Sequence, residues 1–268
     1  MILGHSLDKY LMHARLVIKR RFAFKLDMLL MMGIQIINPL IMLFVWIAIY
    51  FATQTTTINN FSLAQIETYF FVVAAANSII PTVSWTILSD IKTGALFAVM
   101  TKPLSYVKTI IAAALANLLI DALGIAFPIL LIVYFATSTI LSIPLLALFL
   151  LSLCIMFTLW LMFEVFLGYL SFFVVETSGI INMFYFIGDF LGGWLVPLNL
   201  LPSSIGSLTS ILPFQFFYYY PAAIFTHAIS GAQAIGMLPL AAFWLLVMLS
   251  ANWIIISLAK KHMNVVGV

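Results

Sequence analysis

Long apolar stretches with almost no charged residues are the feature that most constrains this chain. Between Lys108 and Lys260 there is no other Lys or Arg. A helix that crosses about 30 Å of hydrocarbon needs about 20 consecutive apolar residues. We assign six such stretches, over residues 28–52, 67–88, 109–135, 143–173, 178–196 and 234–258. The sequence therefore predicts an all-α polytopic membrane protein, with one transmembrane domain over 1–268 and a fifth span that glycines and Asp189 interrupt.

The composition excludes the soluble classes of protein. The chain is 65% hydrophobic and 7% charged, whereas soluble domains are about 45–50% apolar and about 25% charged. Soluble enzymes, nucleic-acid binders and disordered proteins are therefore excluded. With Cys154 as the single cysteine, no disulfide can form within the chain. The sequence shows no metal-ligand spacing, phosphate-binding loop or nucleophile elbow, so we expect no catalytic residue, cofactor or metal site.

The basic residues predict the orientation of the spans. They lie before the first span, between the second and third, and after the sixth. Since basic residues favour the cytoplasmic side, we expect both termini to be cytoplasmic. In residues 7–22, apolar side chains recur at three- and four-residue spacing. This pattern predicts that residues 1–26 form an amphipathic helix along the inner leaflet; a solvated basic tail is the alternative.

Residues 89–106 form the main internal loop. Ser89 or Asp90 can cap a short helix there, and Pro103 can end it. An amphipathic helix offered to the cytoplasm suits docking into a groove on a soluble partner. A connector that rests on the lipid head groups is the alternative.

Residues 197–231 form the second segment that departs from simple spanning helices. Its prolines forbid one continuous helix, and its aromatic residues should not lie in water. We expect short helices that dip back into the outer leaflet, because irregular backbone at that depth must be buried in protein or line a cavity. A simple aromatic belt is the alternative.

Three acidic residues lie inside the predicted spans: Asp121, Glu164 and Asp189. Those spans contain no Lys or Arg to pair with them. A charge in the bilayer costs about 2.5–3.5 kcal/mol on insertion scales. We therefore expect each acid to be protonated, hydrogen-bonded to a neighbouring helix, or exposed to a wet cavity. Either a polar translocation path or a structural role in helix packing fits.

The order of these features resembles the permease subunits of type-two ABC exporters, and among them a branch of short bacterial permeases. The resemblance covers essentially the whole chain. Its local matches are the run from Asp90 to Leu96, the step Lys102-Pro103-Leu104-Ser105, and the glycine and proline pattern of the outer segment.

The resemblance implies a function and its partners. Two permease chains, identical or related, would pair in the inner membrane of a prokaryote, and two ABC ATPase subunits would bind ATP and Mg²⁺. The residues it implies for ATPase coupling are Asp90, Ile91, Lys92, Gly94, Leu96, Lys102 and Pro103. Those it implies for an outer gate are Pro197, Pro202, Pro213, Phe214 and Pro221.

Transport would be outward. Because the spans hold no basic residue for an anionic head group, an apolar or amphiphilic drug, peptide or lipid is the expected cargo. A proton-coupled secondary transporter that uses Asp121 or Asp189 is the alternative.

Overall fold

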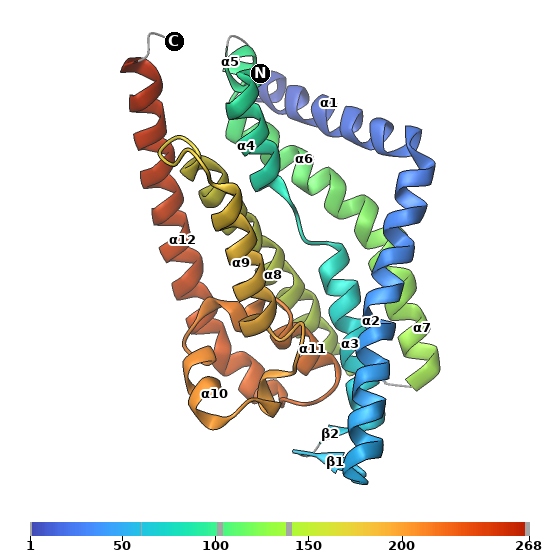
Figure 1. The fold of residues 1–268 in the computed structure, drawn as a ribbon. Coiled ribbons are helices and arrows are strands. Elements are labelled where there is room, and N and C mark those ends of the chain that lie inside the picture. The colour runs from blue at the N-terminus through green and yellow to red at the C-terminus, as the bar shows by residue number, and fades with distance from the viewer. Residues whose placement is uncertain (1, 60, 101–103, 138–140, 266–268) are drawn as a thin grey trace.

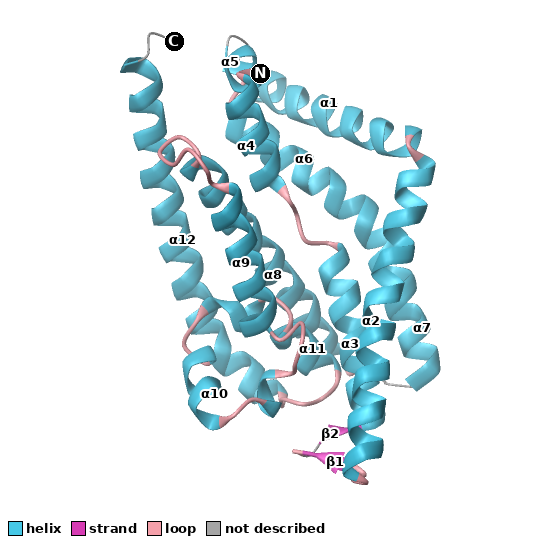
Figure 2. Ribbon diagram, in the orientation of Figure 1, coloured by secondary structure: helices cyan, strands magenta, loops and turns pink. Residues whose placement is uncertain are grey.

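The computed structural model describes residues 2–59, 61–100, 104–137 and 141–265. It is built almost entirely of helices (Figure 2), which confirms the predicted all-α class. The elements are α1 (Ile2–Ala23), α2 (Lys25–Thr53), β1 (Thr57–Ile58), β2 (Phe61–Ser62), α3 (Leu63–Ser78), α4 (Val83–Thr93), α5 (Ala95–Met100), α6 (Tyr106–Asp121), the π-helix η1 (Ala122–Ala126), α7 (Phe127–Thr137), α8 (Ile143–Leu170), α9 (Ser178–Gly192), η2 (Leu198–Leu200), α10 (Ser203–Thr209), η3 (Pro213–Phe216), α11 (Tyr219–Phe225) and α12 (Gly231–Val265).

Five helical stretches among the described residues are long and apolar enough to cross a membrane. They are Gly33–Thr53, Leu63–Lys92, Tyr106–Thr137, Ile143–Leu170 and Gly231–Lys261. The fifth predicted span, 178–196, is not confirmed, because α9 has only 15 residues and ends at Gly193 in the left-handed conformation. At 1.5 Å per residue a helix of this length covers about 22 Å, which is short of the hydrocarbon thickness.

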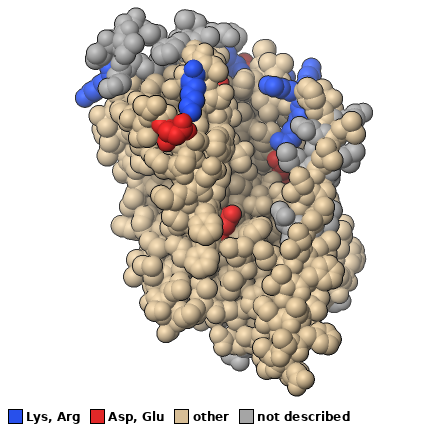
Figure 3. All heavy atoms as spheres, in the orientation of Figure 1, with Lys and Arg blue, Asp and Glu red and all other residues tan. Residues whose placement is uncertain are grey.

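The two termini lie at one end of the molecule, together with α1 and α5 (Figure 1). At the opposite end lie α10, α11 and the small antiparallel hairpin in which Thr57 pairs with Ser62 and Ile58 with Phe61. Lys and Arg side chains gather at the end that holds the termini (Figure 3). Both termini and these basic side chains therefore lie at the same end of the molecule.

Helix α1 lies across the end of the bundle and packs along α6 (Figure 1). The hydroxyl of Tyr10 in α1 accepts a hydrogen bond from the backbone N–H of Ser105, just before α6. The helix ends at Ala23, and Phe24 joins it to α2. Within the predicted N-terminal segment, 1–26, residues 2–23 are therefore helical, and their place along the inner leaflet stays a prediction.

The buried core lies where the outer segment packs against α3 and α8. Its fully buried side chains are mostly aromatic and include Tyr69, Phe216, Phe217 and Tyr220. By contrast, large apolar side chains cover the outer surfaces of the long helices, for example Phe51, Leu123 and Trp253. Exposed apolar surface on this scale is what contact with lipid requires, since a soluble monomer rarely presents it.

Candidate functional site

The second long apolar stretch is broken in its middle. Helix α3 ends at Ser78, and α4 begins at Val83 after four residues without regular structure. Pro81 explains the break, because it has no backbone N–H and disfavours the helical conformation of the residue before it. The prediction of a continuous span over 67–88 missed this interruption, although Pro81 was its visible signal.

A buried carboxylate from another helix caps the start of α4. Oε2 of Glu164, on α8, accepts the backbone N–H of Ser84 at 2.8 Å. Thr82, at the N-cap position, makes no side-chain capping bond. Glu164 is fully buried. Its position suits a carboxylate, because the first turn of a helix offers unpaired N–H groups and a partial positive charge.

The segment from α4 to α5 lies at the basic end of the molecule. Gly94 joins the two helices with φ of +75°, a conformation that glycine adopts without strain. The hydroxyl of Tyr106 in α6 donates to Oδ2 of Asp90 at 2.6 Å. Leu96 is buried against Ile87 and Tyr106. These contacts fasten the segment to the start of α6.

The internal helix begins later than the sequence predicted. Ser89 and Asp90 lie inside α4, which continues to Thr93, so their assignment as caps of the short helix is wrong. The chain stays helical there because no breaking residue precedes Gly94. Lys102 and Pro103 lie outside the described residues.

The residues predicted to couple to an ATPase differ in their exposure. Lys92 is exposed, Ile91 and Gly94 are half-buried, and Leu96 is 1% exposed. Asp90 is half-buried and engaged by the tyrosine of α6. The exposed surface of the segment is thus formed by Lys92 and its neighbours, while Leu96 anchors the segment from within.

An ion pair joins this segment to the loop after α8. Nζ of Lys92 lies 3.7 Å from Oε1 of Glu176. The hydroxyl of Ser178, which donates to the same carboxylate, and then the charge of Lys92 lower the pKa of Glu176. Both groups are exposed, so this pair contributes little to stability.

Asp121 has a basic partner, contrary to the sequence-based expectation. Nη2 of Arg21, at the end of α1, lies 2.8 Å from Oδ1 of Asp121 in α6. The sequence-based expectation named no basic partner for Asp121. It considered only residues within the spans, whereas Arg21 reaches in from the N-terminal helix. This pair lines a cavity of about 660 Å³ bounded by α1, α2, α6 and the break in the second span.

The helix irregularity that follows Asp121 lies in the wall of the same cavity. The π-helical turn covers Ala122–Ala126, and Ile125 lines the cavity. Pro128 explains the turn, because it cannot donate the N–H that an α-helix would direct to residue 124.

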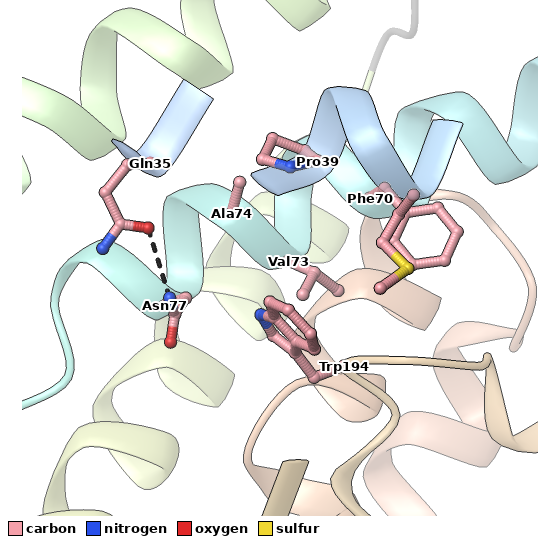
Figure 4. Close-up of a pocket in the computed structure, with 8 residues that line it drawn as sticks. Gln35, Pro39, Phe70, Val73, Ala74, Asn77 and Trp194 are labelled. Atoms are coloured by element: carbon pink, nitrogen blue, oxygen red, sulfur yellow. Dashed lines mark hydrogen bonds between the residues drawn. The ribbon is translucent and has the colours of Figure 1, made fainter. Parts of the chain in front are cut away.

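A chain of hydrogen-bonded polar side chains closes the deep end of the cavity, which lies away from α1. The amides of Gln35 and Asn77 are hydrogen-bonded at 3.2 Å (Figure 4). The hydroxyl of Tyr218 lies 3.2 Å from Oδ1 of Asn77 and 3.0 Å from Oδ1 of Asp189. A tyrosine hydroxyl has one proton, so it cannot donate to both oxygens. Either Asp189 supplies a proton of its own, or the Asn77 amide turns and donates to Tyr218.

Beyond this polar chain the protein is tightly packed. The space beside Gln35, Asn77 and Trp194 has a volume of about 10 Å³ (Figure 4), which is about the space of one water molecule. On the far side, Trp160 packs edge-to-face against Phe217 with ring centroids 4.7 Å apart. The polar cavity is therefore bounded by α1 at the basic end and closed toward the opposite end.

Two glycines of α9 allow close packing of the rings of Trp160, Phe214 and Phe217, which we call the aromatic layer. A Cβ at Gly188 would touch Trp160 and Phe217 at 3.6 Å, and one at Gly192 would lie 3.1 Å from the backbone oxygen of Phe214. Their spacing of four residues places both on one face of the helix. These glycines looked like interruptions of a span in the sequence, and the structure uses them for close contact.

The prolines of the outer segment mark the starts of its short helices. Pro197 and Pro202 hold the N-cap positions of η2 and α10, and Pro213 is the first residue of η3. Pro221 lies in the first turn of α11. Phe214 is half-buried within the aromatic layer, whereas Pro202 is exposed. These positions suit proline, because the first N–H groups of a helix have no intrahelical partner.

The three membrane acids lie in separate surroundings. Asp121 pairs with Arg21, Asp189 ends the polar chain, and Glu164 caps α4. One oxygen of Glu164, Oε1, and the indole N–H of Trp160 are buried without a hydrogen-bond partner in the described part of the chain. The structure therefore does not bring the acids together into one relay.

The comparison with protein families identifies the chain. No curated protein matches it. The family model described as ABC-2 family transporter protein matches residues 36–257, which cover the long apolar helices and the outer segment. Membership implies partnership with an ABC ATPase subunit. The chain therefore belongs to the ABC-2 transporter family and is an ABC-2 type permease.

Proposed function

We propose that this chain is the membrane-spanning permease subunit of an ATP-driven exporter that moves an amphiphilic substrate outward. ATP and Mg²⁺ would bind to two separate ATPase subunits, and a second permease, identical or related, would complete the complex. The observation that carries the proposal is the direct link from the basic end to the cavity: α5, Gly94 and α4 lead to the break at Pro81.

We define the docking segment as residues 89–100. Its contacts allow a movement of its tip to displace α4 and α6. Leu96 and the bond between Asp90 and Tyr106 hold it to α6. Lys92, Thr93 and Ala95 are exposed at its tip, where a soluble subunit can contact them. A movement of the tip would therefore be passed to α4 and α6 together.

The other end of α4 borders the cavity. Ile80 and Thr82, in the break, line it. In the break, the backbone N–H groups of Ile79 and Ile80 bond only to the last turn of α3, so this segment can absorb a change in backbone angles when α4 moves. Glu164 holds the first turn of α4 and would make that movement a pivot. ATP-driven closure of the ATPases would thus change the shape of the cavity.

The proposed location is the inner membrane of a prokaryotic cell, with both termini in the cytoplasm. The basic residues at the end that holds the termini support this orientation. The opposite end, with the outer segment, would then face outward. The packing of Trp160 on Phe217 of the outer segment fits a resting state that is closed to the outside.

Crosslinking from the docking segment tests the proposal. In a Cys154→Ala background, a photoreactive group would be placed on Ala95→Cys at the tip of the segment, in cells of the source organism. The matched control is Thr55→Cys, which is exposed at the opposite end of the molecule. We expect a protein with a phosphate-binding loop to be crosslinked from Ala95→Cys and not from Thr55→Cys. Crosslinking of that protein from Thr55→Cys alone, or of no ATP-binding protein from either position, would contradict the proposal.

A further inference from the structure

The cavity beneath α1 combines charge, hydrogen-bonding groups and apolar surface. Its volume of about 660 Å³ is within the range of sites for small organic ligands. Its polar lining comes from residues far apart in the sequence, including Arg20, Arg21, Gln35, Asn77, Asn117 and Asp121. In Figure 3 the surface is hollowed on the face toward the viewer, between the basic side chains of the α1 side and the body of the bundle.

The charge of the cavity favours an anion. Its charged lining residues are Arg20, Arg21 and Asp121, so two positive charges face one negative charge. Asp121 forms an ion pair with Arg21. The side chain of Arg21 is 33% exposed and that of Asp121 is 12% exposed. Arg20 is exposed and has no acidic partner within the described residues. A guanidinium group presents a planar set of N–H donors that fits carboxylate or phosphate.

The rest of the lining suits a molecule with an apolar part. Val17, Phe24, Ile80 and Ile125 contribute apolar surface. Asn117 and Thr82 have no hydrogen-bond partner among the described side chains, so their amide and hydroxyl groups can donate to a ligand. A polar head group could thus bind the amide and hydroxyl groups, and the start of an alkyl chain could pack on the apolar side chains.

The deep end of the cavity limits how far a ligand can enter. The bond between Gln35 and Asn77 closes it, and the space beyond has room for about one water molecule. A ligand in the cavity would therefore lie between α1 and this pair of amides.

We propose that this cavity binds the head group of an amphiphile with one phosphate or carboxylate group. Arg20 and Arg21 bind the anion, and Asp121 is the resident counter-charge that the ligand displaces from Arg21. The inference rests on the proposed function and names the substrate class for it. It also replaces the sequence-based reason for a neutral cargo, because Arg21 lies beside the spans.

Calorimetry on the full chain in phosphatidylcholine nanodiscs tests this site, with empty nanodiscs as the blank. The probes are octyl phosphate, octyl glucoside with the same alkyl chain, and inorganic phosphate without a chain. We expect octyl phosphate to bind saturably and at least about tenfold more tightly than either reference compound. Equal binding of octyl glucoside would overturn the role of the anion, and equal binding of inorganic phosphate would overturn the role of the alkyl chain.

Asp121→Asn separates a ligand site from a structural ion pair. If Asp121 competes with the ligand for Arg21, removing its charge should tighten octyl phosphate binding several-fold. A merely structural pair would give weaker or unchanged binding, which would overturn the proposal. Arg20→Gln should weaken binding about tenfold, whereas Lys260→Gln, exposed at the same end of the molecule on α12, should leave it unchanged.

Arg21→Gln alone leaves Asp121 buried without its cation, so the double variant Arg21→Gln/Asp121→Asn carries the test of Arg21. It removes both charges and should bind octyl phosphate at least about tenfold more weakly than Asp121→Asn. Equal affinity of the two variants would overturn the assignment of Arg21. Since no ATPase is present, failure here rejects the head-group site and leaves the crosslinking test of the exporter function intact.

Discussion

Replacing Glu164 tests whether a carboxylate on α8 holds the broken second span together. Glu164→Gln keeps an oxygen that can accept the N–H of Ser84, whereas Glu164→Leu does not. Both variants remove the charge, so the difference between them isolates the hydrogen bond. A buried N–H left without an acceptor costs about 1–3 kcal/mol. We therefore expect Glu164→Leu to be about 2 kcal/mol less stable than Glu164→Gln.

Unfolding in mixed micelles with increasing dodecyl sulfate, followed by tryptophan fluorescence, measures this difference. Trp160 lies one turn from Glu164 on α8 and reports on the same region. The matched control is Thr158→Val, which removes a hydrogen bond that Thr158 makes within its own helix. The control should change stability by less than about 0.5 kcal/mol. If the Leu and Gln variants unfold at the same detergent fraction, Glu164 does not cap α4.

Two further predictions concern the outer segment and the loop after α8. Gly193 has φ of +92°, and a Cβ there would lie 2.6 Å from the hydroxyl of Tyr69, which donates to the Gly193 carbonyl. Gly193→Ala should therefore cost about 2–4 kcal/mol in the same unfolding assay, and Gly206→Ala, with open space around it, less than about 0.5 kcal/mol; equal losses would reject the steric argument. The pKa of Glu176 is lowered first by the Ser178 hydroxyl and then by a lysine charge, so its contacts persist below its ordinary pKa and are lost only as the pH falls through the lowered value. Ser178→Ala should raise the pKa of Glu176 toward the ordinary range, read by ¹³C NMR of the carboxyl group, and an unchanged titration would show that the hydroxyl is not the cause.

Most of the spanning helices could be predicted because lipid imposes a simple rule. Long apolar stretches with few charges must form helices, since the bilayer offers the backbone no hydrogen-bond partners. The predicted ranges 109–135 and 234–258 lie inside the observed spans Tyr106–Thr137 and Gly231–Lys261. Stretch 178–196 passed the same composition test, but the left-handed turn at Gly193 ends its helix early.

The site was harder to predict because it depends on contacts between distant residues. Arg21 and Asp121 are 100 positions apart, and nothing in either local sequence indicates that they meet. Glu164 likewise caps a helix that begins 81 positions before it, at Val83, and a cap from another helix has no local sequence signature. The break at Pro81 and the π-helical turn before Pro128 were the parts of the site with a local signal.

The most direct test of the central claim is transport by the chain together with its ATPase. The complex would be reconstituted into liposomes, and movement of a fluorescent amphiphile would be followed on addition of ATP and Mg²⁺ or on imposing a proton gradient. The account predicts movement that requires ATP hydrolysis and proceeds without a proton gradient. Movement driven by the proton gradient in the absence of ATP would contradict it and would favour a secondary transporter.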